Sequence, residues 1–446
     1  MKRTVTSFFD KEYLEYAKYV VENRAIPSCI DGLKPTQRKV VYIANKIWKT
    51  GNEKPMKLFQ LAGRVAAEAF YHHGNTSLES SMVGMAQKFK NSLPLLEGIG
   101  QFGSLRSPSA GAPRYISAKL HPNFRLLYQD FELLDNKIEE GEKIEPEHFL
   151  PIVPTVILNG TSGIAVGFAT NILNRNPKDV VDACISEVNG KRMKTLAPWI
   201  EEFKGTFTRD LENPKTWKIS GSYQIINTNT VKITAIPPNY TYERYEEILN
   251  LLQEKGIITS YDDNSSETIE YVLKFRRSIL KDLVSKDKLE RALRLNTQET
   301  ENLTTIDENG KLKIFNKAEE IVKHFVSIRL GWYQTRKDYL IDKTEKQLSL
   351  VTNKARFIKD IIDGKLKINN VPKEKIVTYL KTNAYDTVHG SYDYLLSMAI
   401  HSLTKERYEK LLLEKEGCII ALKTLKATDP KAMYLADLKK LKAAIK

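Results

Sequence analysis

Arg114 and Tyr115 stand side by side in the segment GAPRYISAK, residues 111–119. A tyrosine phenol, with an ordinary pKa of about 10, is a poor nucleophile until a neighbouring cation or base helps it to form phenolate. The permanently charged guanidinium of Arg114 can hold a phosphate or a developing anion. The pair is therefore compatible with attack of the tyrosine oxygen on a phosphodiester, although an Arg-Tyr dipeptide by itself is more often structural.

Two adjacent histidines, His72 and His73, lie in the sequence YHHG. Neighbouring side chains point to opposite sides of a strand and far apart on a helix, so the pair makes poor joint metal ligands. At a helix end, one histidine can meet a phosphate while the other packs or caps. We expect His73, which faces the following loop, to make the phosphate contact, and His72 to lie beside it at the surface.

Residues 23–40, NRAIPSCIDGLKPTQRKV, carry Arg24, Lys34, Arg38 and Lys39 over a turn and a helix start. Cations in that position suit contacts to phosphates, and they equally suit a solvated basic face. The chain as a whole has 69 Lys and Arg residues against 55 Asp and Glu residues, a formal net charge of +14. This excess favours a polyanionic partner, most often nucleic acid.

The glycine-rich segment NGTSGIAVGFATNIL (159–173) is similar to a phosphate-binding loop but lacks the Gly-Lys-Ser/Thr ending of a nucleotide P-loop. The chain has no GxGxxG fingerprint and no compact carboxylate cluster, so we expect no nucleotide or metal site of its own. Cys29, Cys184 and Cys418 lie far apart and form neither a zinc pattern nor a disulfide framework. With no signal-peptide core and no long apolar stretch, these features predict a cytosolic protein that does not span a membrane.

Short helices near the N-terminus must position the candidate residues. Helical spacing of apolar residues predicts helices within residues 10–50, interrupted by IPSCIDGLKP, and over residues 57–71 and 77–89. Short basic helices with tight turns are typical of helix-turn-helix or winged-helix readers of nucleic acid. The Gly/Ser-rich segment 98–115 is predicted to be a loop and is a candidate for the wing.

From about residue 150 the pattern changes to that of strands. LPIVPTVILNG and GIAVGFAT are apolar, β-branched runs bounded by Gly, Pro and Asn, and residues 220–238 and 268–275 alternate in strand fashion. Residues 243–256 form a helical pattern that ends on a glycine. This part of the chain is therefore predicted to be an α+β segment.

From about residue 317 the pattern indicates long helices. Ile321, Phe325, Ile328 and Trp332 step by four, three and four, as in a coiled coil, and similar steps recur further along and near the C-terminus. Between these stretches lies a compact apolar piece, residues 391–412. Two long helices that close on a small knob predict an antiparallel coiled coil with an interaction tip.

Six segments occur in an order that resembles the DNA breakage-reunion subunit of type IIA DNA topoisomerases. They are VENRAIPSCIDGLKPTQRKVVY, YHHG, AQKF…LPLLEGIGQFGS, APRYISAKL, LNGTSGIAVGFATNI and YDYLLSMAIHSLTKERYEKLL. The resemblance extends from about residue 10 to about residue 440. The short format of the chain is most similar to that of the phage members of the family.

The resemblance implies a multidomain α+β fold. A winged-helix DNA-binding and cleavage domain would span residues 1–147, an α/β tower domain residues 148–316, and a long antiparallel coiled coil residues 317–446. Two copies would cut opposite strands, pass a second duplex, and release it through a C-terminal dimer gate at about 366–415. The apolar residues expected at this gate are Tyr392, Tyr394, Leu395, Leu396, Met398 and Ile400.

Matching the family's motifs assigns a role to each candidate residue. Tyr115 would be the nucleophile that forms a transient 5′-phosphotyrosine link and leaves a free 3′-hydroxyl. Arg114, His73 and Arg24 would contact the scissile phosphate. Ile172 would wedge between base pairs and bend the duplex, at a cost of roughly a few kcal/mol for the unstacked step. The other expected DNA contacts are Lys34, Gln37, Arg38, Lys39, His72 and Asn171.

The resemblance also implies Mg²⁺ and ATP, yet no Toprim or ATPase motif is present in the sequence. We therefore expect one or more partner subunits to bind both, with double-stranded DNA and a second copy of this chain as the other partners, in the cytoplasm of the cell or of a phage host. Because the chain ends at Lys446 without a DNA-wrapping domain, relaxation and decatenation are expected instead of negative supercoiling. Thr76 and Ser80 stand where the bacterial members carry their quinolone-contacting residues, which predicts weak quinolone sensitivity.

Two other functions are compatible with parts of the pattern. A non-catalytic DNA-binding or architectural protein on the same scaffold fits the charge and the helical pattern equally well. The joint presence of all five key residues argues against it, because a degenerate scaffold would have lost at least one of Arg24, His73, Arg114, Tyr115 and Ile172. A single-strand replication nuclease would need a His-hydrophobe-His spacing to bind its metal, and the adjacent histidines lack it.

Overall fold

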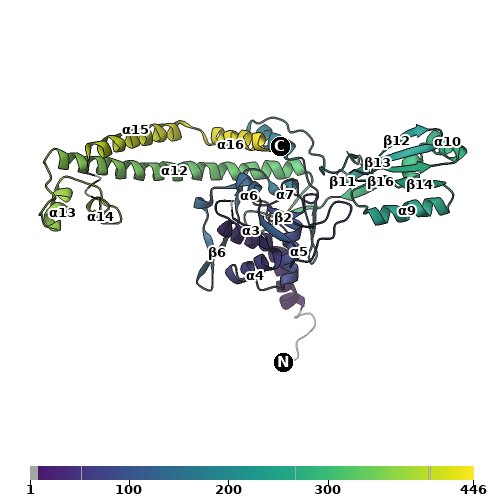
Figure 1. The fold of residues 1–446 in the computed structure, drawn as a ribbon, viewed down its shortest axis with the longest axis horizontal. Helices are drawn as coiled ribbons and strands as arrows, with labels where there is room; N and C mark the ends of the chain where they lie inside the picture. Colours follow the sequence, from purple (N-terminus) through teal and green to yellow (C-terminus); the bar gives the residue numbers. More distant parts are fainter. Residues whose placement is uncertain (1–8, 52, 267, 400, 402, 446) are drawn as a thin grey trace, which may run out of the picture. The chain divides into compact units, whose positions relative to one another are not determined.

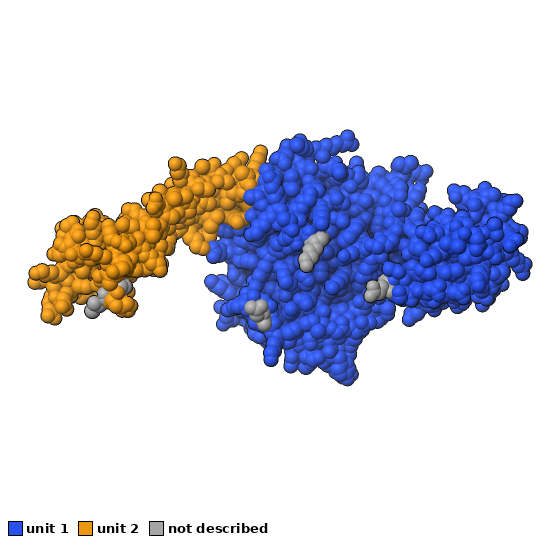
Figure 2. All heavy atoms as spheres, turned by 45° about the horizontal axis from the view of Figure 1, so that its top comes forward, with its two compact units in different colours: residues 1–329, 435–446 blue, residues 330–434 orange. Residues whose placement is uncertain are grey.

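The computed structural model describes residues 9–51, 53–266, 268–399, 401 and 403–445. The chain divides into two compact units, one of residues 1–329 with 435–446 and the other of residues 330–434 (Figure 2). Among the described residues, no helix combines the length and the apolar character that a membrane crossing requires.

Short helices build the N-terminal part of the first unit. Pro35 occupies the first turn of α3, where its missing N–H costs nothing, and the Gln37 side chain accepts the Lys34 N–H at 2.9 Å. Gly32 has a φ of +66° and approaches so closely that a Cβ would lie 2.4 Å from the Val156 nitrogen. The predicted helices over 57–71 and 77–89 are confirmed with shifted ends. The elements are η1 (Phe9–Tyr13), α2 (Leu14–Val20), η2 (Val21–Ala25), α3 (Pro35–Ile47), α4 (Leu58–Glu68) and α5 (Asn75–Ala86).

A three-stranded antiparallel sheet lies beside these helices, in the order β1-β3-β2. Its central strand, β3 (Ser117–Leu120), pairs Ala118 with Met56 of β1 (Met56–Lys57) and with Gly98 of β2 (Leu96–Ile99). The loop predicted over 98–115 therefore joins two paired strands of one sheet. The elements that follow are α6 (Pro122–Leu127), β4 (Tyr128–Gln129), η3 (Phe131–Leu133), β5 (Asn136–Glu139), β6 (Glu142–Pro146) and β7 (Leu150–Pro151).

The strand predicted over LPIVPTVILNG is only partly correct. Leu150 and Pro151 form β7, but the rest of the run contains a short helix, α7 (Thr155–Leu158), all of which is buried. Pro151 and Pro154 explain the difference, because neither can donate to a sheet and a proline suits the start of a helix. The run GIAVGFAT does enter a hairpin, formed by β8 (Thr161–Ile164) and β9 (Ala169–Ile172).

Two antiparallel sheets continue the first unit, in the orders β10-β11-β16 and β12-β13-β15-β14. Helix α9 runs alongside the four-stranded sheet and contributes Tyr245 and Leu249 to its core, against Ile233 of β13 (Figure 1). The helix stops just before Gly256, whose φ of +67° suits a glycine. The elements are α8 (Pro177–Val188), β10 (Thr206–Arg209), β11 (Thr216–Ser220), β12 (Ser222–Asn227), β13 (Thr230–Ala235), α9 (Tyr242–Glu254), β14 (Ser260–Asp263), β15 (Tyr271–Lys274), α10 (Arg277–Ser285), α11 (Leu289–Ala292), β16 (Asn296–Thr300), β17 (Leu303–Ile306) and β18 (Leu312–Phe315).

Long helices dominate the second unit, as the spacing of apolar residues predicts. Within it, α12 and α15 run antiparallel: Glu345 pairs with Lys426 at 2.7 Å, and further along α12 Val351 and Ile358 share a core with Leu411. The elements that contribute to this unit are α12 (Ala318–Ile362), α13 (Lys373–Thr382), α14 (Asp393–Leu396), α15 (Lys405–Ala427) and α16 (Pro430–Ala444) (Figure 1).

Candidate functional site

Tyr115 is 70% exposed and lies two residues before β3, at the end of the loop that leaves β2. Its backbone is held at both polar groups: the N–H donates to the Ala112 carbonyl at 2.9 Å, and the carbonyl accepts from Lys57 Nζ at 2.8 Å. The Arg114 guanidinium carbon lies 5.1 Å from the centre of the tyrosine ring, and Arg114 is itself exposed. The phenol therefore projects into solvent from a fixed backbone, with a permanent cation beside it.

His73 lies between α4 and α5 and contacts two tyrosines. The Tyr19 hydroxyl is 2.8 Å from His73 Nε2, and the Tyr71 ring packs against the imidazole edge-on at 5.3 Å between centroids. Both histidines line a cavity of about 280 Å³, together with Asn23. The neighbouring Arg24 is exposed on η2, and His72 is exposed and lies 3.2 Å from Glu139. The cavity thus combines an imidazole with polar side chains of α2 and η2, next to an exposed arginine.

Lys34 is turned toward the chain and not outward. Its ammonium donates to the Ser162 carbonyl of β8 at 2.7 Å, and burial lowers the pKa of Lys34. A Cβ on Gly163 would lie 2.9 Å from this ammonium and 2.2 Å from the Ala25 carbonyl oxygen, so the hairpin packs tightly here. The Gln37 side chain is occupied at the start of α3. These two residues orient the β8–β9 hairpin and the helix, and a DNA contact by either remains a prediction.

Arg38 and Lys39 both pair with carboxylates of the chain. Arg38 is 4% exposed, and it donates from Nε to Asp31 Oδ2 at 2.7 Å and from Nη2 to Asp31 Oδ1 at 3.0 Å. The Lys39 ammonium lies 3.2 Å from Glu145 and 3.6 Å from Glu139. Burial in an ion pair argues against a phosphate contact by Arg38, whereas Lys39 lines the same cavity as His72 and His73, so a DNA contact by Lys39 remains a prediction.

The β8–β9 hairpin buries Ile172, the expected wedge residue, and exposes another isoleucine. Ile172 is 2% exposed and lies in the core, whereas Ile164, at the other end of the hairpin, is 89% exposed. Asn171 is also engaged internally, donating from Nδ2 to Glu299 at 2.9 Å. Ile164 is therefore the exposed isoleucine of this hairpin, and it is not among the site residues predicted from the sequence. Its signal in the sequence was Gly167, whose φ of +76° makes the turn that places Ile164 at the tip.

Thr76 and Ser80 are both exposed on α5, the helix that follows YHHG. Their hydroxyls occupy one surface of that helix, four residues apart, without the carboxylate that the bacterial members are expected to carry there. The predicted weak response to quinolones therefore rests on two exposed residues and remains a prediction.

The expected gate residues lie in the second unit, around α14. Leu395 is buried in the unit's own core with Phe357 and Leu380, so it is not available to a partner. The Tyr394 hydroxyl donates to the Asp386 carbonyl at 2.7 Å. Ile400 lies outside the described residues. Partly buried positions against the same core are taken by Tyr392, Tyr394, Leu396 and Met398.

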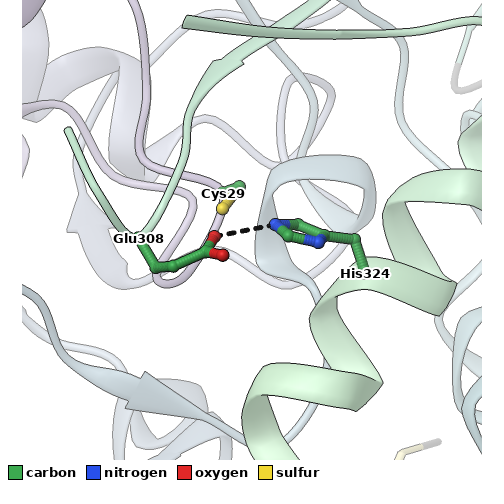
Figure 3. Close-up of side chains that lie close together, drawn as sticks. All are labelled: Cys29, Glu308 and His324. Carbon is green, nitrogen blue, oxygen red and sulfur yellow. Dashed lines mark hydrogen bonds and ion pairs between the residues drawn. The ribbon is translucent and has the colours of Figure 1, made fainter. Parts of the chain in front are cut away.

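One group of side chains in the described part of the chain has the donor types of a metal site. Cys29, Glu308 and His324 bring one donor atom each to within 4.8 Å of one another (Figure 3). Lys313 Nζ, however, lies 3.1 Å from His324 Nδ1 and 3.5 Å from Nε2, where its charge would repel a cation. Burial, together with Glu308, raises the pKa of Cys29 to about 12, so the thiol is protonated at neutral pH. We assign this cluster to packing between the 26–33 loop, the turn that joins β17 to β18, and α12.

The chain is similar to known proteins over nearly its whole length. The family profile for the A subunit of DNA gyrase and topoisomerase IV matches residues 24–441. The DNA topoisomerase medium subunit of Enterobacteria phage T4 is 35% identical over 444 residues, which cover 99% of each chain. The mitochondrial DNA topoisomerase 2 of Dictyostelium discoideum is 34% identical over 457 residues, 98% of this chain and 35% of that protein.

A solved structure is similar over the same extent. The crystal structure of the Plasmodium falciparum topoisomerase II DNA-binding, cleavage and re-ligation domain covers 98% of this chain and 64% of its own, with 33% identity and a TM-score of 0.86. The similarity supports a mixed α/β multidomain fold of the same type. The chain spans about a third of the length of the DNA topoisomerase 2 relatives that it matches, whose remaining two thirds lie outside it.

Proposed function

The chain belongs to the family of DNA gyrase and topoisomerase IV A subunits, and we propose that it is the DNA-cleaving and religating subunit of an ATP-dependent type IIA topoisomerase. The observation that carries the proposal is Tyr115, an exposed phenol beside Arg114 on a backbone fixed by Lys57 and Ala112. A nucleophile gains most when its backbone is held and its reactive atom is free to meet the substrate.

The proposed reaction is a transesterification on the DNA backbone. The Tyr115 oxygen attacks a phosphorus atom and loses its proton to solvent. The bond from phosphorus to the 3′ oxygen breaks, and that oxygen takes up a proton, leaving a 5′-phosphotyrosine and a free 3′-hydroxyl. One ester replaces another, so attack by the hydroxyl reverses the step without an energy source. Arg114 would meet the negative charge that collects on the phosphoryl oxygens, where a fixed cation contributes most.

A DNA-binding surface beyond Tyr115 and Arg114 is supported by three residues on separate elements. Arg24 on η2 is exposed, and His73 lies at the cavity beside it. Ile164 projects from the hairpin tip, as an apolar wedge that unstacks a base step must do. We propose that Arg24 and His73 contact the scissile phosphate and that Ile164, in place of Ile172, bends the duplex.

The proposed division of the fold follows the three patterns of the sequence. The α3, α4 and α5 helices with the β1-β3-β2 sheet fit a winged-helix domain over residues 1–147. The sheets around α9 fit a tower domain over residues 148–316. The antiparallel α12 and α15 fit a coiled coil within residues 317–446, whose knob at about 366–415 would be the dimer gate.

We propose that Mg²⁺ and ATP are bound by a partner subunit. Magnesium prefers hard oxygen ligands in octahedral geometry, and the Cys29, Glu308 and His324 group offers a single carboxylate beside an ammonium. This group therefore does not fit the ion. The other proposed partners are double-stranded DNA and a second copy of the chain, in the cytoplasm of the cell or host.

The test is Tyr115→Phe in the reconstituted holoenzyme, with Tyr16→Phe as a matched loss of one exposed tyrosine hydroxyl. We expect Tyr115→Phe to bind DNA with unchanged affinity while the covalent complex and relaxation disappear, and Tyr16→Phe to retain both. Relaxation by Tyr115→Phe would rule out the assignment and would favour a non-catalytic DNA-binding role.

A further inference from the structure

The loop between β2 and Tyr115 is folded on itself and anchored to α5. The Gly111 N–H donates to the Gln101 carbonyl at 2.8 Å. The Gln87 side chain, which follows α5, donates from Nε2 to the carbonyls of Phe102 at 2.7 Å and Pro108 at 3.1 Å. One amide group therefore gathers two points of the loop. This anchor lies next to α5, among the short helices of the N-terminal part of the first unit.

A second anchor connects the middle of the loop to a distant part of the chain. Arg106 is 7% exposed and lies nine residues before Tyr115. Its Nη1 donates to the Pro237 carbonyl at 2.7 Å and to the Tyr240 carbonyl at 2.9 Å, and its Nη2 donates to the Ile236 carbonyl at 2.6 Å. These carbonyls belong to the turn that connects β13 to α9.

The connection runs in both directions. The Tyr242 N–H, at the start of α9, donates to the Arg106 carbonyl at 3.1 Å. The turn is itself closed by the Tyr240 N–H, which donates to the Pro237 carbonyl at 3.1 Å. Burial lowers the pKa of Arg106 to about 10, so the guanidinium stays charged at neutral pH. A planar charged fork that meets three carbonyls fixes both distance and orientation, because its donors have a rigid geometry.

We propose that Arg106 is a positioning residue for Tyr115, which couples the 236–242 turn to the loop that presents the tyrosine. Without the guanidinium, the outer part of the loop keeps its Gln87 anchor and the bond from the Tyr242 N–H, but it loses all three side-chain bonds to the turn. Three carbonyls then lose their charged donor in a buried place, which favours an alternative arrangement of the loop. The inference rests on the proposed function, since it assigns Arg106 to the presentation of the same nucleophile.

The effect falls on the chemical step and not on DNA affinity. Arg106 is buried and faces carbonyls of its own chain, so it does not contribute a phosphate contact. Tyr115 keeps its own bonds to Ala112 and Lys57, so its displacement is small. A misplacement of about 1 Å caused far from the chemistry can slow a reaction by about 100-fold.

The experiment uses the reconstituted holoenzyme and a short duplex at saturating concentration. The rate of covalent adduct formation and the Kd for the duplex are measured for wild type, Arg106→Met and Arg106→Lys. Arg125→Met is the matched control, because Arg125 also donates to backbone carbonyls, those of Trp48 and Lys49 after α3, away from the turn. Melting temperatures are recorded for every variant.

We expect Arg106→Met to form the adduct about 10- to 100-fold more slowly with a Kd within about twofold of wild type, and Arg106→Lys to recover part of the rate. Arg125→Met should lower the melting temperature and leave the rate unchanged. An unchanged rate in Arg106→Met, or an equal loss in Arg125→Met at matched melting temperature, would overturn the inference alone. If Arg106→Met does not fold, an Arg106→Lys rate equal to wild type overturns it. Absence of an adduct from wild type would overturn the proposed function and the inference with it.

Discussion

The buried pair of Arg38 and Asp31 provides a quantitative prediction, because a basic residue expected to bind DNA proves to lie in the core. Asp31 is 0% exposed and accepts two bonds from Arg38, one from the Leu33 N–H at 3.0 Å and one from the Phe149 N–H at 3.1 Å. Replacing Arg38 by methionine leaves this carboxylate buried with only its two backbone donors. Breaking a buried ion pair from one side costs about 3–5 kcal/mol, so Arg38→Met should lower the free energy of unfolding by that amount.

The double variant Asp31→Leu/Arg38→Met separates charge from packing. Replacing both members of a buried ion pair by apolar residues is often neutral or stabilising, so the double variant should recover most of the loss. Urea denaturation followed by circular dichroism measures both changes. A double variant as unstable as Arg38→Met would show that the penalty is lost packing and not an unpaired carboxylate.

The double variant, compared with Arg24→Met, distinguishes a structural arginine from one that contacts DNA. Each phosphate contact contributes about 0.9 to the slope of log affinity against log salt concentration. Arg24→Met, at an exposed position, should reduce that slope by about 0.9 per contact with little change in stability. The Asp31→Leu/Arg38→Met protein, with most of its stability recovered, should keep the wild-type slope. A slope reduced by one contact in that double variant would refute the placement of Arg38 in the core.

Two further predictions follow from burial. Ile164→Ala should reduce the bending of a bound duplex, measured by energy transfer between labelled DNA ends, without loss of stability. Ile172→Ala should lower the free energy of unfolding by about 2–5 kcal/mol, while the protein that stays folded bends DNA as wild type does. The opposite pattern would return the wedge to Ile172. The Cys29 thiol has a pKa of about 12 in the folded chain and an ordinary pKa of 9.0 in the unfolded chain. Between these pH values the folded state binds more protons than the unfolded state, so the stability should fall as the pH rises from 9 to 12. Cys29→Ala should flatten the decline in urea midpoint between about pH 9 and pH 11, and an equally steep decline would contradict this cause.

Much of the architecture could be predicted from local patterns. The helix that starts at Pro35, the glycine that ends α9 and the long apolar steps of α12 each depend on a few neighbouring residues, and local propensity carries that information. The order of the motifs led to the family, which the profile match over residues 24–441 confirms. The exposed position of Tyr115 beside Arg114 agrees with the predicted chemistry, while its role as nucleophile stays a proposal.

The differences arise where a contact distant in sequence decides the outcome. Arg38 points inward because Asp31, on the preceding turn, and the Phe149 N–H form one buried cluster that no helical pattern reveals. Ile164 and Ile172 both fit a strand pattern, and only the pairing of β8 with β9 shows which one is at the exposed tip. In the same way, no short motif identifies Arg106, since its partners lie about 130 residues away.

The most direct test of the proposed function is the identity of the covalent bond. The holoenzyme is mixed with a duplex, stopped with detergent, digested with trypsin and analysed by mass spectrometry, while terminal transferase reports whether the other DNA end has a free 3′-hydroxyl. We expect nucleotide mass on the peptide that contains Tyr115, together with an extendable 3′ end. An adduct on any other residue, a 3′-linked phosphotyrosine, or no adduct from an active holoenzyme would contradict the assignment.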